Sequence, residues 1–143
     1  MICLASGSPR RRMLLESAGF QLTVRAPNVD ESRRPEETPE DTALRLAHDK
    51  AHHAGTSHVV LGADTIVHLD GQIFDKPTDR DMARSHLMAL SGRWHMVTTG
   101  VCIRQDQRFE HLCVTTRVRF RHLSSKEIER YLVTGEADDK AGA

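Results

Sequence analysis

Aromatic residues and net charge are both scarce in this sequence. Phe, Trp and Tyr make up 4% of the 143 residues, and 20 Lys and Arg are balanced by 20 Asp and Glu. Few aromatic rings leave little surface on which the bases of single-stranded nucleic acid could stack. A net charge of zero produces no overall field that would draw the protein to DNA or to an anionic membrane. We therefore expect no nucleic-acid partner, and any bound anion must be held by a local cluster of charge.

Cysteines and long apolar runs are also few. Cys3, Cys102 and Cys113 are odd in number, lie within apolar stretches and show no CxxC or zinc-ligand spacing. This usage is typical of small core residues in a reducing compartment. No apolar signal segment precedes the first arginines, and no stretch approaches the length needed to span a membrane. The sequence thus predicts a cytoplasmic protein with no membrane partner.

The remaining composition is that of a folded α/β protein, with 38% hydrophobic and 28% charged residues. Periodicity, caps and turn residues predict strands at residues 2–5, 21–25, 59–61, 66–69, 72–74, 94–104 and 109–120, and helices at residues 9–18, 39–54, 79–90 and 125–133. We find no internal repeat or linker. We expect one α/β domain over residues 1–143, with helices flanking a mixed, partly antiparallel sheet.

The first loop combines a helix start with concentrated positive charge. In Ser6-Gly7-Ser8-Pro9-Arg10-Arg11-Arg12, Ser8 suits the N-cap and Pro9 suits the first helical position. Three arginines at the positive end of a helix dipole are unfavourable unless they share an anion with the exposed amides. A phosphate would satisfy both groups. The loop is neither a Walker A motif nor a GxGxxG fingerprint, and ordinary solvated arginines remain the alternative.

Five further charged residues are candidates for chemistry at a phosphate. Asp64 follows a buried-strand signal and a glycine, which predicts a carboxylate at the carboxyl end of a strand, where α/β proteins bind ligands. Asp30 and Glu31 lie in a polar loop, and such carboxylates could hold Mg²⁺ or Mn²⁺. Lys50 lies on the second predicted helix, and Lys76 follows the predicted hairpin. For each residue an ordinary turn, cap or solvated surface role stays open.

Two other clusters are weaker candidates. His48 and His52 are four residues apart on a helix, a spacing that can hold Zn²⁺, but no Glu follows His48 and no third ligand is evident. Arg117, Arg119 and Arg121 line one face of a strand and could contact RNA. A solvated strand face whose charges prevent edge pairing is the favoured interpretation of these arginines. The sequence therefore favours neither a zinc site nor an RNA interface.

Several motifs taken together resemble the Maf family of nucleoside triphosphate pyrophosphatases. The matching stretches span nearly the whole chain in family order: Leu4-Ala5-Ser6-Gly7-Ser8-Pro9-Arg10-Arg11, Val29-Asp30-Glu31, Arg45-Leu46-Ala47, Lys50-Ala51, Gly62-Ala63-Asp64-Thr65-Ile66-Val67, Lys76-Pro77, Leu90-Ser91-Gly92 and Asp139-Lys140-Ala141-Gly142-Ala143. The resemblance implies an elongated α/β fold with a central cleft, similar to that of the inosine triphosphatases. It also implies hydrolysis of a nucleoside triphosphate to the monophosphate and pyrophosphate, with a divalent metal such as Mg²⁺ or Mn²⁺.

The resemblance also implies roles for individual residues. They are the substrate-binding residues Ser8, Arg10, Arg11, Lys50 and Thr65, the metal ligands Glu31 and Asp64, and the catalytic residues Asp64 and Lys76. Asp64 would accept a proton from water, and Lys76 would stabilise transition-state charge. The Gly-Ala-Asp-Thr stretch is similar to the dTTP/UTP pyrophosphatase branch, whereas the branch acting on 7-methyl-GTP typically has Ser-Asp-Gln there. Thr65 and Arg10 would then discriminate between substrates.

Three expectations concern the rest of the protein. Family members continue past the final Ala-Gly-Ala, and the last residues form no finished element, so we expect a C-terminal segment to be missing after Ala143. The enzyme would remove non-standard or excess nucleotides. The alternative function is a non-catalytic nucleotide-binding regulator linked to septum formation. The nucleoside triphosphate is the expected partner, and a homodimer is left open.

Overall fold

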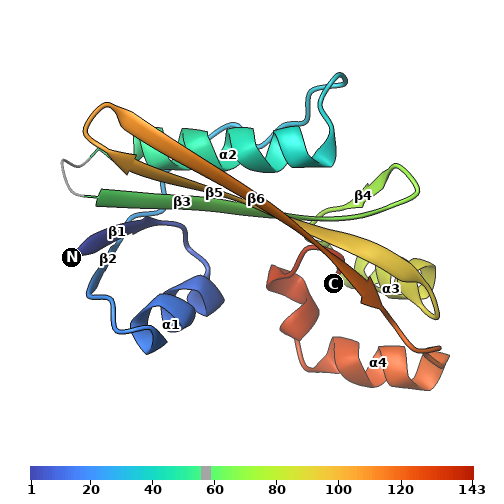
Figure 1. The fold of residues 1–143 in the computed structure, drawn as a ribbon. Coiled ribbons are helices and arrows are strands. Elements are labelled where there is room, and N and C mark those ends of the chain that lie inside the picture. Colours follow the sequence, from blue (N-terminus) through green and yellow to red (C-terminus); the bar gives the residue numbers. More distant parts are fainter. Residues whose placement is uncertain (56–58) are drawn as a thin grey trace. The chain divides into compact units, whose positions relative to one another are not determined.

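The computed structural model of the chain describes residues 1–55 and 59–143. Its elements, coloured along the chain in Figure 1, are β1 (Ile2–Ala5), α1 (Pro9–Ser17), β2 (Leu22–Val24), α2 (Pro39–His53), β3 (Val59–Leu69), β4 (Gln72–Phe74), α3 (Arg80–Leu90), β5 (Trp94–Gln105), β6 (Arg108–Arg119), α4 (Ser125–Val133) and the 3₁₀ helix η1 (Glu136–Asp139). The four predicted helices are confirmed. None of the helices in these two ranges is both long and apolar enough to cross a membrane.

The strands form one mixed sheet with the order β2-β1-β3-β5-β6, and β4 pairs with β3. β1 runs parallel to both β2 and β3, and Ala5 at its end lies opposite Gly62. β3 runs antiparallel to β4. Asp70 and Gly71 join these two strands with left-handed φ values of 50° and 79°, as a type I′ turn requires. The predicted mixed sheet and its hairpin are therefore confirmed.

The chain forms two compact units, which we call unit 1 and unit 2. Unit 1 comprises Met1–Asp64 and Thr99–Val114, and unit 2 comprises Thr65–Thr98 and Thr115–Ala143. Three strands, β3, β5 and β6, contribute residues to both units. The two units therefore share one sheet and form a single α/β fold. The expected absence of a C-terminal segment stays a prediction.

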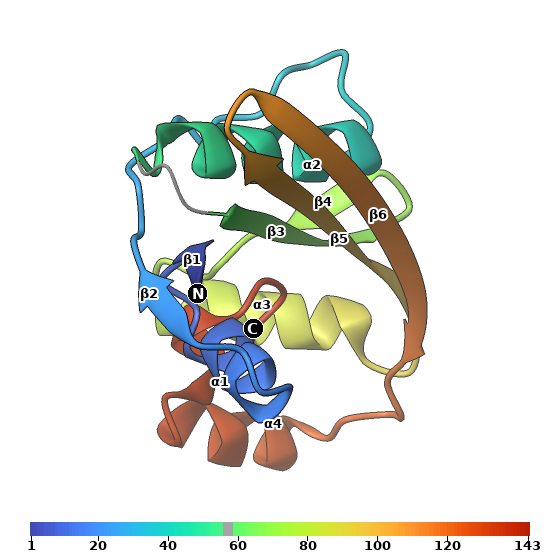
Figure 2. The same ribbon diagram turned by 60° about the vertical axis from the view of Figure 1, so that its left-hand side comes forward.

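Helix α2 packs directly on the sheet of unit 1, where it runs beside β3 in both views (Figure 1, Figure 2). Two glycines permit this close approach. A Cβ on Gly62 would lie 2.2 Å from the carbonyl oxygen of Ala47, and a Cβ on Gly100 would lie 2.4 Å from that of Ala43. Since neither distance is sterically allowed, only glycine fits these positions while α2 stays in place. The core of unit 1 accordingly consists of small side chains: Cys3, Ala5, Ala47, Ala51, Ala54, Val60 and Cys102.

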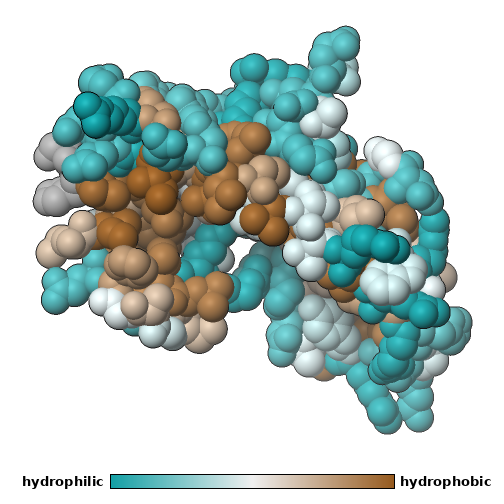
Figure 3. Space-filling view, in the orientation of Figure 1, coloured by the Kyte–Doolittle hydropathy of each residue, from teal (hydrophilic) through white to brown (hydrophobic). Residues whose placement is uncertain are grey.

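The exposed apolar surface of unit 1 includes one face of the β5–β6 ribbon. Ile103, Leu112 and Val114 are 44%, 60% and 52% exposed. Figure 3 shows apolar surface gathered over this part of the molecule. On the opposite face of β6, Phe109 packs against the core of unit 1 and against the His48 ring of α2.

Unit 2 has its own core between α3 and α4. Its members are Ala83, Leu87, Ile128, Leu132 and Ala137. Helix α4 begins with the predicted capping box, in which Ser124 Oγ accepts from the Glu127 N–H while the Glu127 carboxylate accepts from the Ser124 N–H. Phe74 of β4 is buried against Val67 and Leu90.

The structure corrects two predictions of local structure. Residues 59–61 and 66–69 were expected to form separate strands, whereas β3 is one strand of 11 residues. Its first part pairs with β1 and its last part with β4, and this long-range pairing keeps the intervening motif extended. The second correction is at the C-terminal end, where η1 forms and no finished element was expected.

Candidate active site

The loop between β1 and α1 has the predicted strand–loop–helix geometry. Ser8 is the N-cap in an extended conformation, and its Oγ accepts a hydrogen bond from the Arg11 N–H at 3.5 Å. The Ser8 N–H donates in turn to Ser6 Oγ at 3.3 Å. Pro9 occupies the first helical position, where its missing N–H leaves no intrahelical bond unmade. The loop is therefore held by its own serines.

The guanidinium of Arg11 turns into this loop. Its Nη1 donates to Ser6 Oγ and to the carbonyl oxygen of Ala63, both at 2.9 Å. Burial lowers the pKa of Arg11, and the nearby Asp64 carboxylate acts in the opposite direction. Arg12 instead lies on the helix surface, where it pairs with a glutamate one turn along. The adjacent arginines thus divide between the site and the surface.

Lys50 of α2 lies between two carboxylates of unit 1. Its Nζ is 2.7 Å from Asp64 Oδ1 and 2.8 Å from Glu31 Oε1. The side chains of Lys50 and Asp64 are only 12% and 15% exposed, whereas that of Glu31 is 63% exposed. The structure therefore brings together three of the sequence candidates, with the first pair largely buried and Glu31 on the solvent side.

The sequence predicted Asp64 at the carboxyl end of a strand, and this prediction is wrong. Asp64 lies within β3. The reason is that β3 continues past the end of β1, whose last residue Ala5 lies opposite Gly62. Asp64 is thus two residues beyond the carboxyl end of the neighbouring strand, which leads into the first loop. Burial raises the pKa of Asp64, while the charges of Lys50 and Arg11 act against that rise. A carboxylate whose pKa is raised is a better proton acceptor.

The loop that carries Glu31 is anchored to α2 by Arg45. The guanidinium of Arg45 donates to both carboxylate oxygens of Glu37, at 2.5 and 2.8 Å, and to the carbonyl oxygen of Ser32 at 3.0 Å. Asp30, the other acidic candidate of this loop, accepts a hydrogen bond from the Ser32 N–H at 2.9 Å, which is a local turn contact. Arg45 therefore positions the residue that follows Glu31.

Sequence reasoning assigned no role to three groups of the site. They are Ser6 Oγ and the Ala63 carbonyl oxygen, which accept from Arg11, and the Arg45 guanidinium. All three stand within motifs that resemble the family, and this is the signal that could have marked them. The Ala63 carbonyl is a backbone group, so the identity of the residue could not indicate that it accepts a hydrogen bond from Arg11.

Three further candidates lie on α1, in β3 and after β4. Arg10 is exposed on α1. Thr65 is half-buried in β3 and Lys76 is exposed after β4; both belong to unit 2. Their roles, and that of Arg10, stay predictions. Of the RNA-contact candidates, Arg117 and Arg119 lie over the Trp94 ring, 4.9 and 5.9 Å from its centroid, as a packed strand face would have them.

The donor set of Glu31 and Asp64 fits a hard divalent cation. Both carboxylates approach one ammonium group to within 2.8 Å, so they converge on a position that already holds positive charge. Carboxylate oxygens are the ligands that Mg²⁺ and Mn²⁺ prefer. These two residues could therefore hold either metal once Lys50 releases them.

Several known proteins that are similar to this chain share one description. A dTTP/UTP pyrophosphatase of Photorhabdus laumondii is 46% identical over 145 residues, covering 98% of this chain and 74% of the relative. Proteins of the same name from Vibrio cholerae and Anaeromyxobacter dehalogenans are 46% and 47% identical, each over 99% of this chain and over 78% and 75% of their own lengths.

The fold and the family follow from two further comparisons. A solved structure of the Staphylococcus aureus Ham1 protein matches 82% of this chain and 70% of its own, with a TM-score of 0.55 and 12% identity, which shows a shared fold. The family model described as Maf-like protein matches residues 1–143. With both this full-length match and relatives at 46–47% identity, the chain belongs to the Maf family.

Proposed function

We propose that this protein hydrolyses nucleoside triphosphates, with dTTP and UTP preferred, to the monophosphate and pyrophosphate. The observation that carries the proposal is the largely buried contact between Lys50 and Asp64, joined by Glu31, in the unit that also contains the first loop. Acidic groups for a metal and a proton, and cationic groups for phosphates, are what phosphoryl transfer requires. The similar dTTP/UTP pyrophosphatases support the choice of substrate.

In this reaction Asp64 orients a water molecule and takes its proton. The water oxygen forms a bond to the α-phosphorus, the bond from that phosphorus to the bridging oxygen breaks, and pyrophosphate leaves with the electron pair. The raised pKa of Asp64 suits a proton acceptor. General base catalysis of this kind typically contributes about 10²–10⁴-fold to the rate.

The cationic and N–H groups of the chain bind the phosphates. Arg10, Arg11 and the first amides of α1 face an anion at the positive end of a helix dipole, with Ser8 as its cap. Lys76 is assigned to the charge that develops on the departing pyrophosphate. Arg11 is held in place by Ala63, which leaves its geometry fixed before substrate arrives.

Glu31 and Asp64 are the proposed metal ligands, and Lys50 responds to metal binding. A divalent cation, Mg²⁺ or Mn²⁺, would lower the pKa of bound water and neutralise phosphate charge. With a metal bound, Lys50 would release the carboxylates, and its ammonium group would be available to a phosphate oxygen. Lys50 thus serves the site in both states.

Substrate choice is assigned to Thr65 and Arg10, on the strength of the motif shared with the dTTP/UTP branch. Hydroxyl and guanidinium groups can discriminate by hydrogen bonding. The proposed setting is the cytoplasm, where such an enzyme would remove non-standard or excess nucleotides.

The test is pyrophosphate release from dTTP, UTP, CTP, GTP, ATP and 7-methyl-GTP, each with Mg²⁺ or Mn²⁺. Asp64→Asn should lower kcat by roughly 10²-fold or more while nucleotide binding persists. Asp106→Asn is the matched control, because Asp106 lies at an exposed turn with φ 55° that Asn tolerates. Nucleotide binding without release by the wild-type protein would instead favour the regulatory alternative.

A further inference from the structure

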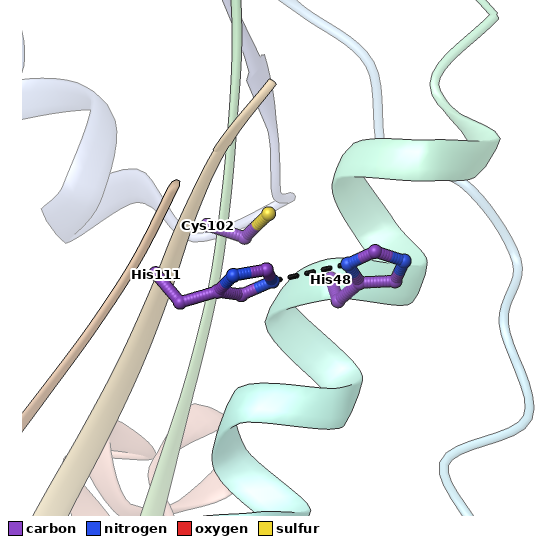
Figure 4. Close-up of side chains that lie close together, drawn as sticks. All are labelled: His48, Cys102 and His111. Carbon is purple, nitrogen blue, oxygen red and sulfur yellow. Dashed lines mark hydrogen bonds between the residues drawn. The ribbon is translucent and has the colours of Figure 1, made fainter. Parts of the chain in front are cut away.

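A second cluster of metal-binding atoms lies in unit 1, where α2 packs on β5 and β6. It comprises His48 of α2, Cys102 of β5 and His111 of β6, and one ligand atom of each lies within 4.8 Å of the others. Figure 4 shows the two imidazoles facing each other across the gap between helix and sheet, with the Cys102 side chain on the neighbouring strand. None of the three takes part in the reaction proposed above.

The two histidines already share a proton. His48 Nδ1 lies 3.0 Å from His111 Nε2, so one nitrogen donates and the other accepts. A metal ion can take the place of that proton between the two rings. The imidazole that donated the proton then carries its N–H on its other ring nitrogen. Burial, followed by the neighbouring His111, lowers the pKa of His48, which favours the neutral imidazole that metals require.

Cys102 supplies the third donor from the interior. The residue is completely buried, and burial raises the pKa of its thiol to about 11. Without a metal the group is therefore an uncharged thiol at neutral pH. A divalent cation that binds the sulfur displaces the proton to solvent and compensates the buried negative charge.

Neighbouring contacts hold the three donors in position. Gly100 of β5 allows the backbone of α2 to approach the sheet, and Arg104 of the same strand donates to the carbonyl oxygen of His52 at 2.7 Å. Phe109 packs against the His48 ring with a centroid separation of 4.5 Å. His111 itself is exposed, which gives an ion a path from solvent. The packing of α2 on the sheet therefore holds the three donors close together, and solvent can reach the cluster at His111.

We propose that His48, Cys102 and His111 bind a borderline-soft divalent cation such as Zn²⁺ or Co²⁺, with a fourth position for water. Two imidazoles and a thiolate select such metals over Mg²⁺ and Mn²⁺. Tetrahedral zinc keeps its N and S ligands about 3.3–3.6 Å apart, within reach of these atoms by small side-chain rotations. The site is distinct from the carboxylates of Glu31 and Asp64 and does not depend on the proposed reaction.

The sequence offered a different partner for His48. The four-residue spacing on a helix predicted that His48 and His52 would bind a metal together. In the structure the ring centroids of these two residues are 6.2 Å apart, and His52 is outside the cluster. The ligands Cys102 and His111 come from strands more than 50 residues away, as the numbering shows. This difference makes the two pairings experimentally separable.

The test is titration of the purified, metal-free protein with Co²⁺, followed by absorption. A thiolate ligand produces a sulfur-to-cobalt charge-transfer band that carboxylate sites cannot produce. We expect the band in the wild-type protein and in Asp64→Asn, Cys113→Ser and His52→Gln, and its loss in Cys102→Ser. His111→Gln should weaken binding by more than roughly tenfold, because even outer-shell changes have effects of that size. Zn²⁺ should displace the cobalt.

Cys102 is buried, so Cys102→Ser could lose cobalt binding because the variant misfolds. His111 is exposed, so His111→Gln tests the site with less risk to the fold. Circular dichroism of each metal-free variant checks its fold. The proposal is overturned if the wild-type protein gives no band, if the band survives Cys102→Ser, or if His111→Gln binds cobalt as tightly as the wild type. Failure of pyrophosphate release with an intact cobalt band would affect the proposed function alone.

Discussion

The Arg11 guanidinium donates to the carbonyl oxygen of Ala63, the residue immediately before Asp64, at 2.9 Å. This bond ties the first loop to β3 and fixes a cation beside the proposed proton acceptor. Lysine, with a single ammonium group, cannot reproduce the planar donor arrangement of arginine. We expect Arg11→Lys to lower kcat/KM by roughly 10–100-fold, the factor that loss of a hydrogen bond to a charged group gives. Arg12→Lys on the outer surface of α1 is the control, and an equal loss there would contradict the assignment.

Lys50 competes with a metal for the same two carboxylates. Lys50→Met removes the competing ammonium and should tighten Mn²⁺ binding in the absence of nucleotide by roughly fivefold, equivalent to about 1 kcal/mol of lost ion pairing. The same change should slow turnover, because the phosphates lose a cation. Mn²⁺ titration and pyrophosphate release measure the two effects. Lys126→Met, at an exposed position of α4, should change neither. Weaker Mn²⁺ binding by Lys50→Met would argue against shared ligands.

Lys76 is the proposed cation for the leaving group. Lys76→Ala should reduce kcat/KM for dTTP by roughly 10–100-fold, since a charge-assisted contact in the transition state is lost. Because Lys76 is exposed, the thermal midpoint should stay unchanged. Steady-state kinetics and thermal unfolding of this variant, with Lys126→Ala alongside, provide the check. An unaltered kcat/KM would remove Lys76 from the mechanism.

Gly62 permits the close contact between β3 and α2. Gly62→Ala would place a methyl group 2.2 Å from the carbonyl oxygen of Ala47, so helix and strand must separate. We expect the free energy of unfolding to fall by roughly 1–3 kcal/mol or more, as overpacking of a rigid contact does. Urea unfolding measures this change. Gly7→Ala, whose added Cβ would make an ordinary 3.7 Å contact, should have a much smaller effect.

Two buried histidines in unit 2 make stability sensitive to acid. Burial lowers the pKa of His86 and of His95, and the Nδ1 atom of each has no hydrogen-bond partner in the described structure. The unfolded chain therefore binds more protons as pH falls below about 6.5, and the folded state loses stability, by up to about 1.4 kcal/mol per pH unit for each histidine. Urea unfolding at pH 7.5 and pH 5.5 tests this. The loss should shrink in His86→Met and persist in His122→Gln, which alters an exposed histidine.

Local residues were sufficient to predict the helix starts and the hairpin. Ser8, Thr38 and Ser124 act as N-caps through bonds to residues three positions along, and Asp70-Gly71 has the left-handed φ values that these residue types favour in a two-residue turn. These features depend on contacts within a few residues. The sequence therefore contained all that was needed to anticipate them.

Features of the site that join distant segments could not be predicted in the same way. The bond from Arg11 to Ala63 spans 52 residues, and the continuity of β3 through Asp64 depends on pairing with both β1 and β4. Residue types identified Lys50, Asp64 and Glu31 as candidates but did not show that the ammonium lies between the carboxylates. The cysteine–histidine cluster was likewise hidden, since it needs α2, β5 and β6 in place.

The interleaving of the two units has a consequence for the order of events on the ribosome. Lys50 and Asp64 emerge early, but the unit that holds them also needs residues 99–114, which follow a stretch belonging to the other unit. Domains generally fold as units during synthesis. In the nascent chain, α2 and β3 therefore cannot complete the fold of unit 1 until β5 and β6 have been synthesised. We expect a nascent chain stalled before residue 99 to be cut readily by a protease.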